Sequence, residues 1–429
     1  MDVAPTTSRV REQTVMKTKV FPGWYVVFAA HVLLALIFGG AYSFGAFFAQ
    51  IQSNFEVGRF SVASVFSLTA LIYYSVGVFS GSLADRISAR VVIGLGIVLL
   101  ALGFFLSSLA SESLPWFLVC FCLLVGLGVG LVYVPTVTAV QRWFVKNRSK
   151  ASGIALAGTG VGTFVGPSTA GLLMQHFSWE STLQIFAVAI LVVGLLVASL
   201  VRSHPQELGL FPDGLVPSAS NPQRHVAASG MGLADAARTG RFWWYFGAIF
   251  FGSVGLFLAL VHINPYARQW GISATQANLL IGLIGVGNVA GRLFLGGLGD
   301  RMGPRRLLMV LTCALVLLNL LWLGAHTFIT LALFAVCFGV ANGGCISLYP
   351  AVAAHWFGTA NLGAILGALY MSVGVAALIG GSVAGLLFDL YQSYAASILL
   401  GALCALLSVL FVLIAGRQVT QVAVPASSA

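Results

Sequence analysis

Charged side chains are scarce in this chain of 429 residues, since Asp, Glu, Lys and Arg together make up only 7% of it. A soluble domain carries about a quarter charged residues, so this chain lacks the side chains that a water-facing surface needs. Hydrophobic residues take their place at 59%, and the mean hydropathy is +0.99. The composition excludes a soluble enzyme and indicates a membrane protein.

Cysteine is also sparse, and its placement excludes several site types. All six cysteines fall inside apolar runs, which predicts small buried side chains and not ligands. No further ligand stands near Cys120 and Cys122, so we expect no metal site and no cofactor. A Walker-type phosphate loop is absent, which argues against ATP as an energy source. The net charge of +10 does not indicate nucleic acid, because the basic residues fall in short stretches between apolar runs.

Long apolar runs are what the sequence has in abundance. A membrane-spanning helix needs about 20 mostly apolar residues. The first run is too long for the core of a signal peptide, so it is expected to remain as a spanning helix. The sequence therefore predicts an all-α protein in a lipid bilayer with twelve transmembrane helices, at residues 24–50, 59–83, 91–110, 115–140, 151–174, 180–201, 243–267, 274–298, 306–326, 329–352, 361–387 and 394–416.

The loop charges predict the orientation in the membrane. If the twelve runs alternate in direction, 18 of the 21 basic residues fall on one side, and the opposite side has only Arg59 and Arg268. An excess of Lys and Arg marks the cytoplasmic side. Both chain ends are therefore expected in the cytoplasm, with the protein in the plasma (inner) membrane.

The chain reads as two halves of six helices. Residues 202–241 form the only long polar stretch and contain four prolines, which is typical of a linker. We expect a cytoplasmic tail at 1–20, one bundle at 21–201, the cytoplasmic linker at 202–241, a second bundle at 242–417 and a tail at 418–429. The loop GSLADRISAR at 81–90 repeats as GLGDRMGPRR at 297–306, and RWF at 142–144 repeats as HWF at 355–357. The two motifs recur after nearly the same number of residues. This repeat predicts two pseudo-symmetric six-helix bundles with a site between them.

These residues carry a family resemblance. The duplicated loops resemble the signature loops of the major facilitator superfamily, and the match covers nearly the whole chain. FPGW at 21–24 is similar to part of the entry motif of the monocarboxylate porters. The stretch from Arg142 to Gly158 resembles a motif of that family and of its oxalate/formate exchanger relatives. The resemblance implies the major facilitator fold and transport by alternating access.

The duplicated loops supply candidate gating residues: Asp85, Arg86, Asp300 and Arg301. A carboxylate at the end of one helix can meet the N-terminus of a neighbouring helix and pair with arginine. The resemblance implies a lock between the halves that breaks when the cytoplasmic gate opens. The alternative is a structural contact that holds the loop in place and has no role in gating.

Arg292 is the candidate substrate-binding residue. It is the only Lys, Arg, Asp or Glu well inside a predicted helix. An arginine inside a membrane is costly and normally faces a partner or a wet cavity. Because no acidic residue lies at similar depth, an anionic substrate is the natural partner, with the guanidinium fork matching a carboxylate. The alternative is that Arg292 pairs with Asp300 or with main-chain carbonyls at the gate.

The number of buried charges limits the class of substrate that the site can bind. One cation favours a substrate with one negative charge. Oxalate exchangers similar to this chain have a second cation in their eleventh spanning helix. The eleventh run of this chain, 361–387, contains no Lys or Arg. Pumps for organic cations would need an intramembrane Asp or Glu, which is absent.

Further polar residues are candidates for the same site. Asn288 lies one helical turn before Arg292, where animal monocarboxylate porters have an Asp, so it is available to bond a carboxylate. Tyr42, Tyr133, Tyr349 and Tyr370 fall on helices that line the cavity in this superfamily. Phenols offer hydrogen bonds to a carboxylate and apolar walls to its tail, although packing alone is an alternative for each. Tyr73 and Tyr74 are weaker candidates, because one of two neighbours must point away.

His31 and His262 are the candidates to carry a coupled proton, since imidazole titrates near neutral pH. The alternative is a neutral, hydrogen-bonded histidine at each position.

The sequence thus predicts a secondary transporter, and not an enzyme, for a small monocarboxylate such as lactate or pyruvate. Proton symport is implied by the resemblance, and a monomer is expected. Anion exchange in the same fold is one alternative, and a non-transporting membrane sensor is another.

Overall fold

The structure is a computed structural model, and it describes residues 21–56, 59–214 and 230–417. These residues are almost entirely helical. The first half of the chain contains α1 (Gly23–Phe55), α2 (Arg59–Arg86), α3 (Ala89–Ser108), α4 (Leu114–Leu118), the π-helix η1 (Val119–Val125), α5 (Gly126–Trp143), α6 (Arg148–Leu173) and α7 (Trp179–Ala198). The second half contains α9 (Gly240–Gln269), α10 (Ala274–Met302), α11 (Pro304–Trp322), α12 (Phe328–Phe357), α13 (Leu362–Tyr391) and α14 (Ala395–Arg417).

Each of the twelve predicted runs is helical in the structure. The fourth run is built from α4, η1 and α5, which continue directly into one another. Ten helical segments of the described chain are long and apolar enough to cross a membrane, and α2 and α6 are not among these ten. The observed ends differ from the predicted ones by up to five residues: α1 and α12 run five residues further, whereas α11 ends four residues earlier.

The polar stretch between the halves contains only short helices where it is described. These are the 3₁₀ turns η2 (Pro205–Leu208) and η3 (Pro212–Gly214) and the helix α8 (Leu233–Ala237). Residues 215–229 of the predicted linker and both predicted tails lie outside the described residues. The helix α9 begins at Gly240, two residues before the predicted start of the second bundle. We call the end of the molecule at which 202–214 and 230–239 lie the linker end, and the opposite end the far end.

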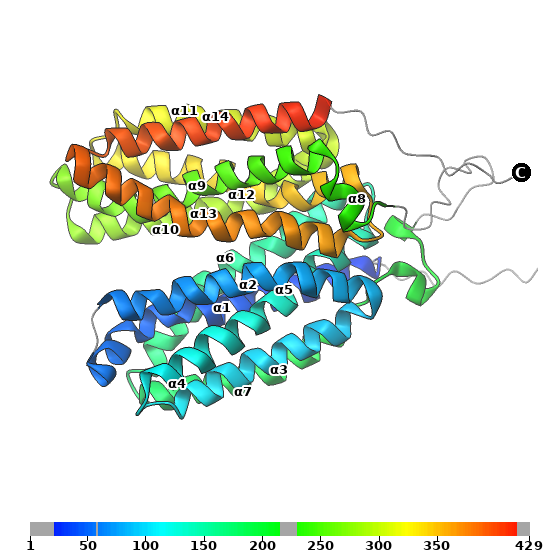
Figure 1. The fold of residues 1–429 in the computed structure, drawn as a ribbon, viewed down its shortest axis with the longest axis horizontal. Coiled ribbons are helices and arrows are strands. Elements are labelled where there is room, and N and C mark those ends of the chain that lie inside the picture. Colours follow the sequence, from blue (N-terminus) through cyan, green and yellow to red (C-terminus); the bar gives the residue numbers. More distant parts are fainter. Residues whose placement is uncertain (1–20, 57–58, 215–229, 418–429) are drawn as a thin grey trace, which may run out of the picture.

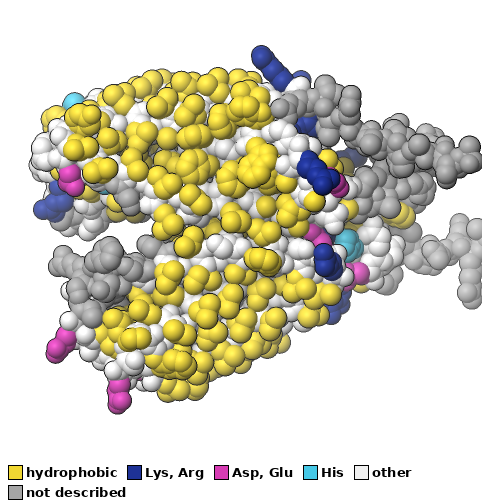
Figure 2. Space-filling view, viewed as in Figure 1, with side chains coloured by type: hydrophobic (Ala, Val, Ile, Leu, Met, Phe, Trp, Pro, Cys, Tyr) yellow, Lys and Arg dark blue, Asp and Glu magenta, His cyan; other side chains and the backbone are white. Residues whose placement is uncertain are grey.

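The two halves of the chain form two neighbouring layers of helices. In Figure 1 the helices α1 to α7 lie below α9 to α14, and the layers meet along α2 and α13 and along α6 and α10. Figure 2 shows the surface notched between the two layers at the far end, whereas the layers touch at the linker end. The structure is therefore closed at the linker end.

The molecular surface is apolar along the length of the helices. Hydrophobic side chains cover the visible face, and charged side chains gather at the two ends (Figure 2). Large hydrophobic residues stand fully outward, such as Phe294 with 78% of its surface exposed. Such a surface suits lipid and not water. Cys313 and Cys337 also lie on this surface, so the prediction that all six cysteines are buried is wrong for these two.

The glycines of α6 let its backbone touch two other helices. A Cβ added to Gly158, Gly162 or Gly166 would overlap with a carbonyl oxygen of α1, and one added to Gly153 would overlap with the carbonyl oxygen of Arg292 in α10. Small residues that allow backbones to approach are the usual means of joining membrane helices. The helix α6 therefore joins both halves, and it brings Arg292 against the first half.

Candidate substrate site and interhelical caps

Arg292 lies inside the molecule, at the boundary between the two halves. Only 8% of its surface is exposed. Its Nη1 donates hydrogen bonds to the Leu156 carbonyl oxygen, at 2.6 Å, and to the Thr159 hydroxyl, both on α6. Its Nε has no hydrogen-bond partner among the described residues. No described carboxylate forms an ion pair with it, and Asp300 in particular bonds elsewhere.

Four tyrosines lie close enough to the guanidinium of Arg292 to interact with its charge. They come from α1, α2, α5 and α13 and are Tyr42, Tyr74, Tyr133 and Tyr370. The rings of Tyr133 and Tyr370 stack across the boundary between the halves, with centroids 5.4 Å apart. The Tyr370 side chain is buried, and its hydroxyl lies close to that of Tyr133. Three of the four predicted tyrosines thus gather at Arg292, together with Tyr74.

Two predicted members of the site point elsewhere. The Asn288 amide donates to the Asn342 side chain of α12 at 3.2 Å, inside the second half. The Tyr349 hydroxyl lies against Gly252 of α9, and its ring packs against Tyr245. Neither side chain is brought into contact with the guanidinium of Arg292.

The two candidate proton carriers occupy different surroundings. His31 Nδ1 lies 2.7 Å from the Ile154 carbonyl oxygen, so this imidazole joins α1 to α6. His262 is buried in α9 and its ring lies 5.5 Å from that of Tyr394, with Gly385 of α13 nearby. Both remain candidates, and His31 is the one on the helix pair that carries the partners of Arg292.

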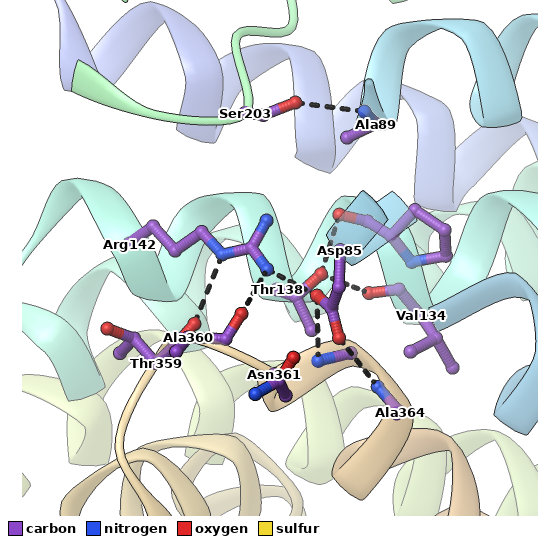
Figure 3. A network of polar contacts seen from close by, with 12 residues as sticks. Asp85, Ala89, Val134, Thr138, Arg142, Ser203, Thr359, Ala360, Asn361 and Ala364 are labelled. Atoms are coloured by element: carbon purple, nitrogen blue, oxygen red, sulfur yellow. Dashed lines mark hydrogen bonds and ion pairs between the residues drawn. The ribbon is translucent and has the colours of Figure 1, made fainter. Parts of the chain in front are cut away.

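Asp85 caps the first turn of α13, across the boundary between the halves (Figure 3). Its carboxylate accepts hydrogen bonds from the main-chain N–H groups of Gly363, at 3.3 Å, and Ala364, at 3.1 Å. Arg142 of α5 forms an ion pair with the same carboxylate, and both side chains are almost completely buried. We call this arrangement the Asp85 cap.

Arg142 itself also crosses the boundary. Its Nε donates to the Thr359 carbonyl oxygen at 3.3 Å, and its Nη2 lies 3.5 Å from that of Ala360 (Figure 3). One buried cation therefore neutralises Asp85 and bonds the segment that precedes α13. Nearby His204, in the loop after α7, is half-buried, and its burial and the Arg142 charge lower its pKa, opposed by Glu207.

Asp300 forms the corresponding cap on α6. Its carboxylate accepts from the N–H groups of Ser149, at 2.8 Å, and Lys150, at 2.9 Å. We call this arrangement the Asp300 cap. The other two predicted gating residues, Arg86 and Arg301, are exposed and form no ion pair with a described residue.

Three residues of these sites were missed or underrated in the sequence. Arg142 stands out only through the repeated RWF and HWF motifs, which did not identify it as the partner of Asp85. Tyr74 is adjacent to Tyr73, and their rings lie 4.4 Å apart. Thr159 carries no sequence signal, since one threonine in a glycine-rich helix has many possible roles.

Comparison with known families and structures agrees with this architecture. The model of the Major Facilitator Superfamily matches residues 30–268 and 244–428, which is nearly the whole chain. The chain belongs to this superfamily. The matching family consists of transporters and not of enzymes, and its members are multi-pass integral membrane proteins.

Similar proteins include monocarboxylate transporters of animals. Monocarboxylate transporter 13 of Bos taurus is 28% identical over 377 residues, which cover 87% of this chain and 85% of that protein. Monocarboxylate transporter 12-B of Danio rerio is 26% identical over 399 residues, covering 88% and 83%. The predicted resemblance to the superfamily and its monocarboxylate porters is confirmed.

Solved structures of the superfamily share the fold. The transporter FucP in the outward conformation aligns with a TM-score of 0.69 and 18% identity, over 92% of this chain and 100% of that one. The human organic anion transporter MFSD10 aligns with a TM-score of 0.71 and 16% identity, over the same shares. At these identities the likeness establishes the fold alone.

Proposed function

We propose that this protein is a secondary active transporter of a small organic monoanion, such as lactate or pyruvate, that works by alternating access with proton symport. The observation that carries the proposal is Arg292, a buried cation without a carboxylate partner among the described residues. A buried unpaired charge is costly, and a substrate carboxylate would remove that cost.

The surroundings of Arg292 support a single carboxylate as the ligand. No other Lys or Arg lies well inside one of the twelve apolar runs of the sequence. The phenols of Tyr42, Tyr74, Tyr133 and Tyr370 offer hydrogen-bond donors to the anion and flat apolar surfaces to its tail. The animal relatives, which are named monocarboxylate transporters, are consistent with this substrate class.

We further propose twelve membrane crossings in two six-helix bundles, at 21–201 and 242–417, joined by the linker 202–241. The linker end would face the cytoplasm with both termini, in the plasma (inner) membrane, because the basic loop residues gather there. In this orientation the structure is closed to the cytoplasm. Opening would break the Asp85 and Asp300 caps, which join the first half to α13 and the second half to α6.

The experiment is uptake into proteoliposomes by the purified protein. A panel of labelled monocarboxylates, dicarboxylates and organic cations is presented with and without an acid-outside pH gradient. We expect saturable uptake of small monocarboxylates that the gradient accelerates. Arg292→Gln should abolish this uptake, and the control Arg268→Gln, which removes an exposed arginine, should retain it.

Other outcomes would replace the proposal. Uptake that requires a loaded counter-anion and ignores the gradient would identify an exchanger. Saturable binding without uptake of any compound would favour a non-transporting sensor. Uptake of a monocarboxylate by Arg292→Gln at the normal rate would remove the assigned site.

A further inference from the structure

The guanidinium of Arg292 is oriented by the other half of the chain. Arg292 is on α10, and its two acceptors, the Leu156 carbonyl oxygen and the Thr159 hydroxyl, are three residues apart on α6. Positions three apart lie on the same face of a helix. Both bonds use Nη1, so they fix the rotation of the planar group about its axis.

The opposite edge of the guanidinium stays available. Nε has no hydrogen-bond partner among the described residues, and Nη2 bonds to none of them. Nε and Nη2 together form an edge whose two N–H groups match the two oxygens of a carboxylate. Tyr370 is also buried at this boundary and interacts with the same charge, so its hydroxyl can serve as a third donor.

We propose that Thr159 is a positioning residue for substrate, which holds Arg292 so that its Nε–Nη2 edge receives the carboxylate. This inference rests on the proposed function. The substrate does not displace Thr159, because the two use different nitrogens. A guanidinium already held in the bound orientation loses less conformational freedom on binding, so affinity is higher.

The test compares three variants of α6 by titration of purified protein with the best monocarboxylate of the uptake panel. Thr159→Val removes the hydroxyl at nearly constant volume and should weaken binding by about threefold to tenfold, as expected when one freed side chain must be ordered again on binding. Thr159→Ser restores the hydroxyl and should bind within about twofold of the unchanged protein. The control Thr163→Val, whose hydroxyl bonds only within α6, should bind normally.

The kinetic signature separates positioning from a structural role. Thr159→Val should raise KM while the maximal uptake rate stays near normal, and its melting temperature should match that of Thr163→Val. Unchanged or tighter binding in Thr159→Val would overturn the inference, since tighter binding would mean that Thr159 competes with substrate. Either result leaves Arg292 as the site, whereas failure of the unchanged protein to bind any monocarboxylate would instead refute the proposed function.

A second inference comes from a difference between the two caps. Asp85 and Asp300 occupy corresponding positions of the repeat, as do RWF at 142–144 and HWF at 355–357. The residue that corresponds to Arg142 is therefore His355. No ion pair or hydrogen bond joins the His355 imidazole to a described residue.

At the Asp300 cap, no described side chain forms an ion pair with the carboxylate as Arg142 does with Asp85. A cavity of about 410 Å³ lies there, and its lining includes Lys146, Arg148, Asp300 and His355. The imidazole is shorter than an arginine side chain and exposed at the linker end, so protons can reach it. The Asp300 cap thus has a titratable group where the Asp85 cap has a permanent cation.

We infer that His355 is a proton-binding site that tightens the Asp300 cap when it is protonated. The imidazolium would play the same role as Arg142. It would lie beside the carboxylate of Asp300 and next to the segment that precedes α6. Burial, Arg148 and, from α9, Arg241 oppose protonation. Lys146 and the carboxylate of Asp300 line the same cavity, and Asp213, from the loop after α7, accepts a hydrogen bond from the main chain of Lys146. Burial, together with the charges of Arg148 and Arg241, lowers the pKa of the His355 imidazole from its ordinary value, so the response falls in mildly acidic solution.

The test measures the opening of the linker end directly and without substrate. Spin labels at Ile87→Cys and Arg417→Cys, both exposed and one in each half, report the separation by pulsed electron resonance in a cysteine-free background. As the pH falls from about 8 to about 5.5, the short-distance population should grow. His355→Arg should hold the short distance at every pH, and His355→Gln should be longer and insensitive to pH.

The reciprocal variant is a matched control. Arg142→His installs the same imidazole at the Asp85 cap, so it should enlarge the pH response in the same direction. A full pH response in His355→Gln, or none in the parent protein, would overturn this inference. Neither result bears on the substrate, because no ligand is present in the experiment.

Discussion

Asp85 and Arg142 form a buried pair of opposite charges whose other bonds reach the second half of the chain. Their side chains are 4% and 2% exposed, whereas those of the other ion pair among the described residues, Asp235 and Arg238, are 65% and 83% exposed. Removing one partner of a buried pair leaves the other charged and without compensation. Exposed pairs contribute little, because water and salt screen them.

Arg142→Gln should therefore lower stability by about 3 kcal/mol or more. Arg238→Gln serves as the control and should cost no more than about 1 kcal/mol. The measurement is the melting temperature of each purified variant in the same detergent. Equal losses in the two variants would show that the Asp85 cap is not an important contact.

Asp300→Asn tests the gating role of the second cap. The amide keeps one acceptor oxygen for the N–H groups of Ser149 and Lys150 but loses the charge that favours a helix N-terminus. Transport should slow while binding of the monocarboxylate is retained, because the change weakens a contact between halves and spares Arg292. A normal turnover number in proteoliposomes would show that the Asp300 cap is a structural contact without a gating role.

The residues of the site differ in how far the sequence could predict them. Arg292 was identifiable because a charge inside an apolar run is rare and needs a partner. Tyr349 and Asn288 share the composition and depth of a site residue, yet they bond within the second half. Which face of a helix a side chain takes depends on the packing of its neighbours, and composition does not contain that information.

At the scale of elements, α6 depends on its glycines for contact with α1. A Cβ at Gly162 would overlap with the carbonyl oxygen of Ala35, whereas one at Gly171 would meet nothing within 4 Å. Both glycines belong to the same helix, so replacing either one changes the helix propensity by nearly the same amount. They differ in whether an added Cβ would touch α1.

Gly162→Ala should therefore destabilise the protein, because α1 must move away from α6 and lose close packing. Gly171→Ala should be neutral or slightly stabilising, as alanine favours a helix by up to about 1 kcal/mol over glycine. Melting temperature and folded yield of the two variants check this. A Gly162→Ala protein as stable as Gly171→Ala would contradict the packing account.

Helix positions were predictable because long apolar runs that are separated by charged residues indicate membrane-spanning helices and few other structures. Their ends were less predictable, since polar residues such as Asp300 stay in the last turn of α10 when a neighbouring helix bonds them. The π-helical turn η1 within the fourth run has no signature in the sequence, because its residues are ordinary apolar ones.

At the scale of the whole molecule, the repeat predicted two halves, but it did not predict which end is closed. That depends on contacts between halves, such as Arg142 with the carbonyl oxygens before α13, which no single run of residues contains. The orientation in the membrane rests on the loop charges.

Cysteine labelling tests that orientation. Ser220→Cys and Val424→Cys, each in a cysteine-free background, should react with an impermeant reagent only after the cells are opened. Labelling of either residue in sealed, right-side-out cells would refute the twelve-helix topology with cytoplasmic termini.

The central claim is that Arg292 binds the substrate carboxylate, and ligand-induced thermal stabilisation of the purified protein tests it most directly. The best monocarboxylate should raise the melting temperature of the unchanged protein and of Arg268→Gln. It should stabilise Arg292→Lys weakly, because an ammonium keeps the charge without the planar fork, and Arg292→Gln not at all. Each variant is first shown to be folded by its own cooperative melting. Full stabilisation of Arg292→Gln by the same acid would contradict the account.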